Sequence, residues 1–308
     1  MNATVEICEV GPRDGYQGIG PFIPTDTKLR FLERLVGAGL RRIEIGSFVS
    51  PSAVPQMRDT PEILDACARF PGIEPQVLVP SERRGRDAIA AGAKRLVFVL
   101  SVSEAHNRNN VRRTPLESAE EYGRLASALP AGVDIRLALS TTFDCPFIGR
   151  VAEADALALL DHLIPMRPDA EICLCDTTGR ADPAQVDSLV RAAQARFPGV
   201  ERWALHAHDT YGLGATNVYA AFKAGIASFD ASFAGLGGCP FAPGATGNVA
   251  TEDLVWMFER MGISTGIDLA ALIPIAQDGA GISGGMPGGR VRDAFSARPD
   301  ACATRMAS

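Results

Sequence analysis

Short apolar segments typical of β-strands alternate with amphipathic segments typical of helices along almost the whole chain. The strand candidates are residues 5–10, 42–45, 76–79, 95–100, 134–139, 171–174, 203–208 and 228–233. The helix candidates between and after them are residues 26–38, 60–70, 83–91, 116–129, 151–163, 183–197, 213–224 and 251–261. Eight such units in a row favour a closed parallel barrel over an open sheet. The sequence therefore predicts an α/β fold, a single (β/α)8 TIM barrel with a short C-terminal extension.

The glycine-rich C-terminal region marks the only change in composition along the chain. Residues 269–276 are expected to form a partial helix, after which six of the twelve residues in 279–290 are glycine. Such a segment buries too little apolar surface for a regular element. We therefore expect a catalytic barrel domain over residues 1–278 and a tail over residues 279–308 that forms a lid or is disordered.

Charge and cysteine usage exclude several classes of protein. The net charge is −6 and the isoelectric point is near 5.3, so no basic surface indicates nucleic acid or an anionic membrane as a partner. The N-terminal residues lack the pattern of a signal peptide, and no apolar run reaches membrane-spanning length. Seven cysteines are scattered without zinc-ribbon pairing and are expected to be reduced thiols. A cytoplasmic location is the expectation.

Two of the four histidines, His206 and His208, lie at the end of the seventh strand candidate. Alternate residues of a strand point to the same side, so both imidazoles can face one point. In barrels of this kind reactive groups collect at the carboxyl ends of the strands. The pair can hold a metal ion, or it can be two hydrogen-bonded histidines.

Oxygen donors at other strand ends complete a candidate metal site. Asp14 follows the first strand, and Asn248 follows the loop after the eighth. Two imidazoles, a carboxylate and a carboxamide suit a six-coordinate divalent ion such as Mg²⁺ or Mn²⁺ better than a structural zinc. Open coordination positions would let the ion chelate a substrate hydroxyl and a neighbouring carboxylate or carbonyl.

Two further residues are candidates for chemistry. Arg13 is next to Asp14, where a guanidinium can neutralise an enolate oxygen, although an Arg-Asp pair taken alone is most often a surface feature. Cys239 lies in a glycine-rich loop that would let a thiol approach a substrate, whereas a buried structural cysteine is the commoner case. The loop lacks the Gly-Lys-Ser/Thr ending of a P-loop, which excludes that mode of nucleotide binding.

Several long motifs together resemble one known family. They are VGPRDG at residues 10–15, SFVSP at 47–51, VPQM at 54–57, HAHDTYG at 206–212, AGLGGCP at 234–240 and GNVATED at 247–253. The chain from about residue 5 to residue 269 thereby resembles 3-hydroxy-3-methylglutaryl-CoA lyase, within the DRE-TIM metallolyase superfamily.

The resemblance implies a divalent-metal-dependent retro-Claisen lyase that splits a 3-hydroxyacyl-CoA into acetyl-CoA and a keto acid, and it implies a homodimer. The metal ligands it implies are Asp14, His206, His208 and Asn248. In the catalytic set, Arg13 would stabilise the enolate, Glu44 and Asp176 would support the site, and Cys239 would share in proton transfer. The substrate contacts expected are Arg13, Tyr16, Gln17, Ser47, Asn110 and Ala138.

The sequence departs from the family pattern around the acyl pocket. Tyr16 stands in a stretch, residues 15–20, that lacks the acid and the lysine usual there. Ala138 replaces a usual aromatic residue, and Cys173 stands where serine is common. One or two such changes can shift preference among homologous acyl chains by ~10- to 200-fold. The substrate is therefore expected to be 3-hydroxy-3-methylglutaryl-CoA or a close 3-hydroxy-3-alkyl analogue such as citramalyl-CoA.

Alternatives remain open at this stage. An acetyl-CoA-condensing synthase of the isopropylmalate or citramalate type shares the barrel and the metal, but such synthases usually carry a further C-terminal domain. A non-catalytic metal-binding barrel is the alternative from a different class. Because the tail differs from the family, Arg108, Arg112 and Arg113 are candidates for the CoA phosphates, although a solvated arginine cluster is the simpler interpretation.

Overall fold

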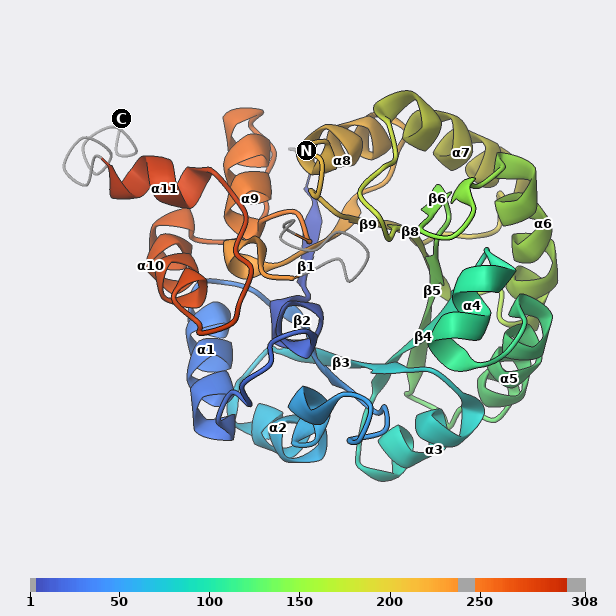
Figure 1. Cartoon of the computed structure of the whole chain (residues 1–308), viewed down its shortest axis with the longest axis horizontal. Coiled ribbons are helices and arrows are strands. Elements are labelled where there is room, and N and C mark those ends of the chain that lie inside the picture. Colours follow the sequence, from blue (N-terminus) through green and yellow to red (C-terminus); the bar gives the residue numbers. More distant parts are fainter. Residues whose placement is uncertain (1–3, 238–246, 298–308) are drawn as a thin grey trace.

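The computed structural model describes residues 4–237 and 247–297 and shows a closed barrel of eight parallel strands (Figure 1). The barrel strands are β1 (Glu6–Glu9), β2 (Arg42–Ser47), β3 (Glu74–Val79), β4 (Arg95–Ser101), β5 (Asp134–Ser140), β8 (Glu171–Asp176), β9 (Trp203–Ala207) and β10 (Ser228–Ala231). Each strand pairs with its neighbours in chain order, and β1 closes the ring by pairing with both β2 and β10. The prediction of a (β/α)8 barrel is confirmed.

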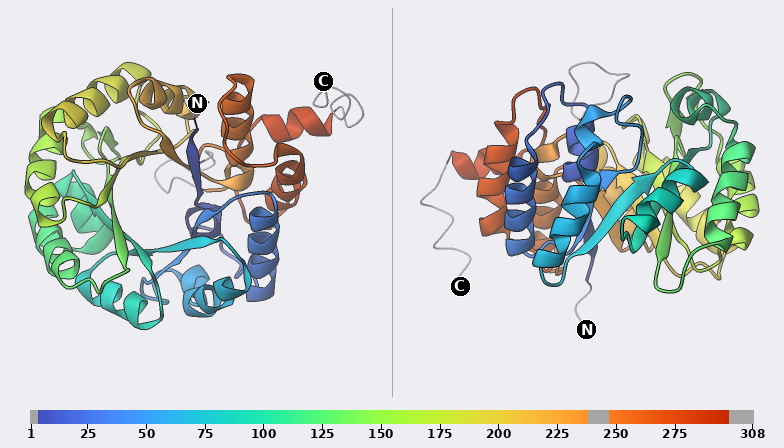
Figure 2. Two further views of the ribbon diagram at one scale, coloured as in Figure 1. Left: turned by 180° about the vertical axis from the view of Figure 1, so that it is seen from behind. Right: turned by 90° about the horizontal axis from the view of Figure 1, so that it is seen from below.

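Helices form an outer ring around the strands (Figures 1 and 2). They are α1 (Thr25–Gly37), α2 (Thr60–Ala66), α3 (Glu82–Ala90), α5 (Pro115–Ser127), α6 (Glu153–Leu163), α7 (Pro183–Arg196), α8 (Gly214–Lys223) and α9 (Thr251–Arg260). A further helix, α4 (Glu104–Val111), lies inside this ring (Figure 1). Several begin with side-chain caps; Thr114 and Glu117 form a capping box at the start of α5. Among the described residues, none of the helices has the length and apolar character needed to cross a membrane.

Strand alternation divides the barrel into an outer core and an interior. On β4, Leu96, Phe98 and Leu100 pack in the main hydrophobic core beneath the helices. Val97 and Val99, between them, belong to a separate small cluster inside the barrel. Because every strand runs in the same direction, all the carboxyl ends meet at one face of the barrel, and the segments that follow the strands surround it.

Three short elements were not expected from the sequence. A π-helical turn, η1 (Gly11–Gly15), follows β1 directly. Helix α4 is capped by Ser103, whose hydroxyl accepts from the His106 backbone N–H, and its mixed polar sequence has no clear apolar stripe. A two-stranded hairpin, β6 (Asp144–Cys145) with β7 (Gly149–Arg150), lies between β5 and α6. Elements this short carry too few residues for periodicity to reveal them.

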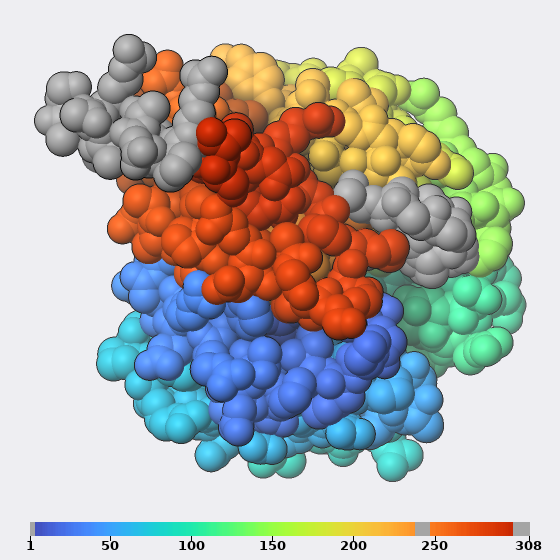
Figure 3. All heavy atoms as spheres, turned by 60° about the vertical axis from the view of Figure 1, so that its left-hand side comes forward, coloured from blue at the N-terminus to red at the C-terminus, as the bar shows by residue number. Residues whose placement is uncertain are grey.

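The C-terminal segment follows a definite path over its described residues. Helix α10 (Leu269–Ala280) extends past the predicted partial helix, and α11 (Val291–Ser296) lies within the region expected to lack regular structure. Between them, residues 281–290 form no helix or strand, as their glycine content indicated. The Gly288 backbone N–H donates to Ala234 O at 2.8 Å. Figure 3 shows this segment lying against both the N-terminal residues and the last helices. The division into a barrel and a separate tail stays a prediction.

Candidate active site

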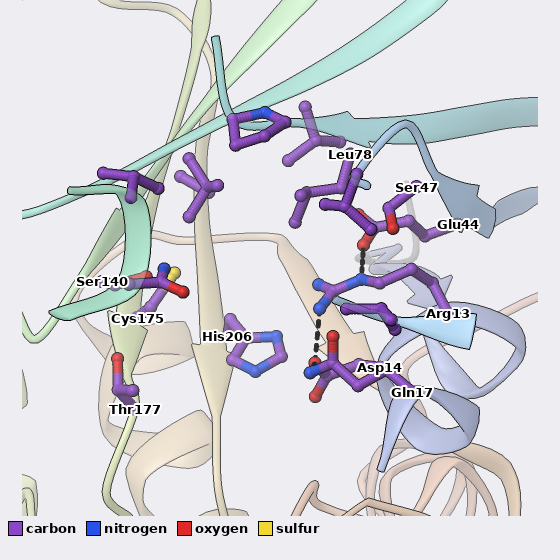
Figure 4. Close-up of a pocket in the computed structure, with 18 of the residues that line it drawn as sticks. Arg13, Asp14, Gln17, Glu44, Ser47, Leu78, Ser140, Cys175, Thr177 and His206 are labelled. Carbon is purple, nitrogen blue, oxygen red and sulfur yellow. Dashed lines mark hydrogen bonds and ion pairs between the residues drawn. The ribbon is translucent and has the colours of Figure 1, made fainter. Parts of the chain in front are cut away.

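A cavity of about 660 Å³ opens at the carboxyl ends of the barrel strands. Charged side chains from β2, β9, β10 and η1 line one side of it, and side chains from β3, β4, β5 and β8 line the other. Figure 4 shows Arg13 and Asp14 facing Ser140 and Cys175 across this space, with His206 between them. The sequence-predicted residues at the strand ends therefore meet around one cavity.

Asp14, His206 and His208 form the candidate metal centre. Each offers a ligand atom, and these atoms all lie within 4.8 Å of one another. His206 is on β9 and His208 follows it, so strand alternation turns both rings to one side, as the sequence predicted. Asp14 reaches them from η1, where the Val10 carbonyl accepts from both the Arg13 and the Asp14 backbone N–H.

Asn248 lies beside this group and completes the predicted ligand set. Its Nδ2 donates to Asp14 at 2.8 Å and to Leu236 O at 3.0 Å. Its Oδ1 is buried and has no hydrogen-bond partner among the residues that the structure describes, and the same holds for Nδ1 of His208. Orphaned buried polar atoms are costly unless a further group satisfies them. An oxygen donor left unpaired beside two imidazoles and a carboxylate is consistent with a divalent cation at this point.

Asp230, on β10, orients one of these imidazoles and was not predicted from the sequence. Its carboxylate accepts from His206 Nδ1 at 3.1 Å and from Arg136 at 2.8 Å. Burial lowers the pKa of His206, but the hydrogen bond to Asp230 and the surrounding negative charges together outweigh burial and raise that pKa to about 9. Burial would raise the pKa of Asp230, yet Arg136 and His206 together hold that pKa well below its ordinary value. The bond leaves Nε2 of His206 as the nitrogen available to a metal.

Arg13 is held between two carboxylates. Its guanidinium contacts Glu44 on one side and Asp14 on the other (Figure 4). Gln76 donates to the other oxygen of Glu44 at 3.1 Å, which fixes that carboxylate in turn. Burial lowers the pKa of Arg13, but the charges of Asp14 and Glu44 more than compensate, so the guanidinium stays charged. A fixed cation therefore faces the cavity next to the candidate metal ligands.

Asp176 lies at the end of β8 but does not itself line the cavity; its neighbours Cys175 and Thr177 do. Its carboxylate is fully buried and accepts from the Ala181 backbone N–H at 3.3 Å. Burial raises the pKa of Asp176 to about 6, and the nearby charge of His208 opposes that rise. Its position fits the supporting role that the family resemblance implied.

All but one of the predicted substrate contacts line the cavity. Gln17, Ser47, Asn110 and Ala138 line the cavity, and Gln17 also donates to Asp14 at 2.9 Å. Tyr16 does not belong to the lining. Its ring is fully buried and packs edge-to-face on Phe233, 6.0 Å away. The expectation that Tyr16 contacts the substrate is corrected, since the turn η1 directs this side chain into the apolar core.

Cys239 lies outside the described residues, so its predicted role stays a prediction. At the rim, Arg112 and Arg113 line the cavity at the end of α4. Arg113 donates to Pro80 O at 3.1 Å, and Arg112 adopts a left-handed conformation with φ of 62°. Arg108 is different: it pairs with Glu104 at 2.7 Å on the exposed face of α4 and is not part of the lining.

The fold and this site define the class: a (β/α)8 barrel whose strand ends bring a candidate metal centre and a charged arginine to one cavity. The HMGL-like family model matches residues 4–278. The chain is 42% identical over 281 residues to (R)-citramalyl-CoA lyase of Chloroflexus aurantiacus, covering 88% of each. It is 39% identical over 274 residues to hydroxymethylglutaryl-CoA lyase of Bacillus subtilis, covering 89% of this chain and 91% of that one. The chain belongs to the HMGL-like family and is an enzyme of this lyase family.

Solved structures agree with this assignment. The Bacillus subtilis HMG-CoA lyase structure superposes with a TM-score of 0.90 at 37% identity, covering 96% of this chain and all of that one. An Acinetobacter baumannii HMG-CoA lyase, solved with coenzyme A and 3-methylmalate, superposes with a TM-score of 0.88 at 39% identity. That alignment covers 94% of this chain and 95% of the other.

Proposed function

We propose that this protein is a divalent-metal-dependent lyase that cleaves a 3-hydroxyacyl-CoA by retro-Claisen chemistry. In this reaction the 3-hydroxyl loses its proton, C3 becomes a carbonyl carbon and the C2–C3 bond breaks. The electron pair of that bond forms the enolate of acetyl-CoA, which then takes up a proton at C2. The observation that carries the proposal is the convergence of Asp14, His206 and His208 within 4.8 Å beside the cavity that Arg13 enters.

Asp14, His206, His208 and Asn248 are proposed to hold the metal. A bound Mg²⁺ or Mn²⁺ would lower the pKa of the substrate hydroxyl and fix its orientation. The residues prepare that site in two ways. Asp230 fixes the ring of His206 through Nδ1. Asn248 holds Asp14 through its amide nitrogen and presents an oxygen that none of the described residues satisfies.

Arg13 is proposed to stabilise the enolate. Glu44 and Asp14 hold its guanidinium in place before substrate arrives, so little reorganisation is needed when negative charge develops. Cys239 is proposed to protonate the enolate carbon, as the family resemblance implies. Glu44 and Asp176 contribute by position: Glu44 contacts Arg13, and Asp176 anchors the turn after β8.

The remaining lining residues suggest how the substrate is held. Arg112 and Arg113 at the rim offer two positive charges for the phosphates of coenzyme A. At the floor, Arg136 lines the cavity with a guanidinium that also pairs with Asp230 at 2.8 Å. An acyl group with its own carboxylate would be attracted by the arginines that line the cavity. This supports 3-hydroxy-3-methylglutaryl-CoA or a close 3-hydroxy-3-alkyl analogue; citramalyl-CoA is the alternative that the 42% identical relative favours.

The test is a panel of 3-hydroxyacyl-CoA thioesters incubated with the protein and Mg²⁺ or Mn²⁺, with acetyl-CoA release followed over time. Release from at least one carboxylate-bearing member, abolished by chelation, is expected. No release from any member would overturn the proposal. Consumption of acetyl-CoA with a 2-keto acid, in the absence of cleavage, would instead identify a condensing synthase. A homodimer and a cytoplasmic location stay predictions of the family resemblance.

A further inference from the structure

One side of the cavity is apolar, and the polar chemistry described above does not use it. The side chains of this apolar wall are Val49, Leu78, Val97, Val99, Ala138 and Cys175. They pack together, with Cys173 and Ala204 beneath them, as a hydrophobic cluster distinct from the main core. Leu78, Val99 and Ala138 are each 9% exposed, whereas Leu96, Phe98 and Leu100 of the neighbouring core are fully buried. The wall therefore faces the cavity.

Strand register places the wall beside the reacting groups. Cys175 on β8 pairs with His206 on β9, so the last residue of the wall is the direct neighbour of a candidate metal ligand. Ala138 pairs with Val99, and Leu78 with Val97, which continues the wall across β5, β4 and β3. A group attached to the reacting carbon can therefore reach the wall without leaving the cavity.

The inward face of β5 shows how narrowly the apolar layer is defined. Arg136 lies at the floor, Ala138 in the wall and Ser140 at the rim, two residues apart each time. The wall is thus bounded by charge below and by hydroxyl groups above. A carboxylate placed against the wall would find no hydrogen-bond partner there, whereas a hydrocarbon group needs none.

Small side chains leave room in this layer. Ala138, Cys173, Cys175 and Ala204 are the inward residues of β5, β8 and β9 at this depth. A larger residue at Ala138 or Cys175, which line the cavity, would occupy part of its space. An empty apolar space of this kind is filled most favourably by apolar ligand atoms.

Resting on the lyase function proposed above, we propose that the apolar wall binds an extended hydrocarbon substituent on C3 of the substrate, longer than methyl. The substrate class is then a 3-hydroxy-3-alkyl acyl-CoA whose alkyl branch has several carbons. Each methylene buried against the wall should favour binding by about fourfold, until the space is filled. Three extra methylenes correspond to a preference of roughly 50-fold.

The test compares two 3-hydroxyglutaryl-CoA thioesters that differ only at C3, one with a methyl and one with an n-butyl group. We expect wild-type kcat/KM to be at least tenfold higher for the n-butyl compound. Equal values, or a preference for methyl, would overturn the proposal while the lyase function stood. Cleavage of neither compound would count against the lyase function. In that case, the affinities of both thioesters for the Arg13→Ala protein, measured by calorimetry, would test the proposed role of the apolar wall. Equal affinities would overturn that proposal.

Substitutions in the apolar wall test whether its residues cause the preference for the n-butyl compound. Ala138→Phe fills the wall, so the ratio of n-butyl to methyl kcat/KM should fall at least tenfold. Ala131→Phe adds the same bulk at an exposed turn just before β5 and should leave the ratio unchanged. Leu78→Asn, which keeps the side-chain size but adds an unpaired amide, covers the case in which Ala138→Phe does not fold, and should lower the ratio about tenfold. An unchanged ratio in folded Ala138→Phe or Leu78→Asn protein would contradict the proposal.

Discussion

The Asp230 carboxylate lies between His206 Nδ1, at 3.1 Å, and the Arg136 guanidinium, at 2.8 Å. This arrangement links a candidate metal ligand to a charge layer inside the barrel, because Arg136 also lies 3.7 Å from Glu171. Asp230 therefore does two things. It fixes the orientation and tautomer of the imidazole, and it neutralises a buried arginine.

Replacing Asp230 by asparagine should weaken metal binding. The amide keeps the shape but loses the charge that makes His206 a better donor, so Mn²⁺ affinity should fall about 10- to 100-fold. Titration with Mn²⁺ followed by electron paramagnetic resonance measures this directly. Asp187→Asn, on the exposed face of α7, is the matched control and should bind Mn²⁺ like the wild type. Unchanged affinity in Asp230→Asn would show that the carboxylate does not orient the ligand.

Arg13→Ala should separate catalysis from metal binding. Loss of the cation that faces the developing enolate should lower kcat at least a hundredfold, on the order of 3 kcal/mol. Mn²⁺ binding should persist, because Asp14 is then freed from its ion pair with the arginine. Arg13→Lys, which retains a positive charge, should recover part of the activity. An Arg13→Ala enzyme of wild-type activity would favour a site without an enolate intermediate.

Sequence patterns predicted the barrel and the positions of its candidate metal ligands because both depend on periodicity within one strand or at its end. His206 and His208 share a side through the two-residue repeat, and each strand end is marked by the change from apolar to polar residues. Asn248 and Asp14 were found from their positions after strands and from long motifs. All four meet as expected.

The features that sequence reasoning missed depend on contacts between distant strands. Asp230 and Arg136 are separated by 94 residues, and only the closed barrel brings them together. Tyr16 was misplaced because η1, a single turn of unusual helix, decides which way its ring points. The two-residue alternation of residues 228–233 could have placed the Asp230 side chain inside the barrel. It could not have given the partners of this carboxylate, because they lie on other strands and meet it only in the closed barrel.

Arg112→Ala and Arg113→Ala should raise KM for a CoA thioester while kcat stays near the wild-type value. Neither rim arginine has a proposed part in the reaction itself, and an exposed charge pair is worth up to about 1 kcal/mol, so each variant should raise KM no more than about fivefold. The difference from wild type should shrink at high salt. Arg124→Ala, on α5 and away from the cavity, is the control. A KM that does not change in either rim variant would place the CoA phosphates elsewhere.

Stability should fall as the pH rises through neutrality, owing to Glu252. This carboxylate is fully buried at the start of α9 and accepts from the Ala234 backbone N–H at 3.1 Å. Burial raises the pKa of Glu252 from 4.5 to about 8, so the folded protein binds an extra proton between those values. The stabilisation is complete below about pH 4.5 and is lost as pH approaches 8, on the order of 4 kcal/mol.

Urea denaturation between pH 5 and pH 9 measures this loss, and Glu252→Gln, which mimics the protonated form, should flatten the profile. Some slope should remain, because burial also raises the pKa of Glu9 to about 7. A Glu252→Gln profile as steep as that of the wild type would mean that Glu252 is ionised in the folded protein.

Gly235→Ala should detach the C-terminal segment from the barrel. A Cβ at Gly235 would lie 2.8 to 3.0 Å from the backbone of Gly288, closer than atoms can pack, so residues near 288 must move away. Gly132→Ala is the matched control, because Gly132 also has a positive φ, 79° against 58°, but nothing lies within 4 Å of its Cβ position. The control should lose about 1 kcal/mol from backbone strain alone, and Gly235→Ala a further ~1 to 3 kcal/mol from the contact. Urea denaturation gives both values, and faster proteolytic cleavage within residues 281–297 should accompany only the Gly235 variant. Equal losses in the two proteins, with unchanged cleavage, would show that the segment does not pack against the loop after β10.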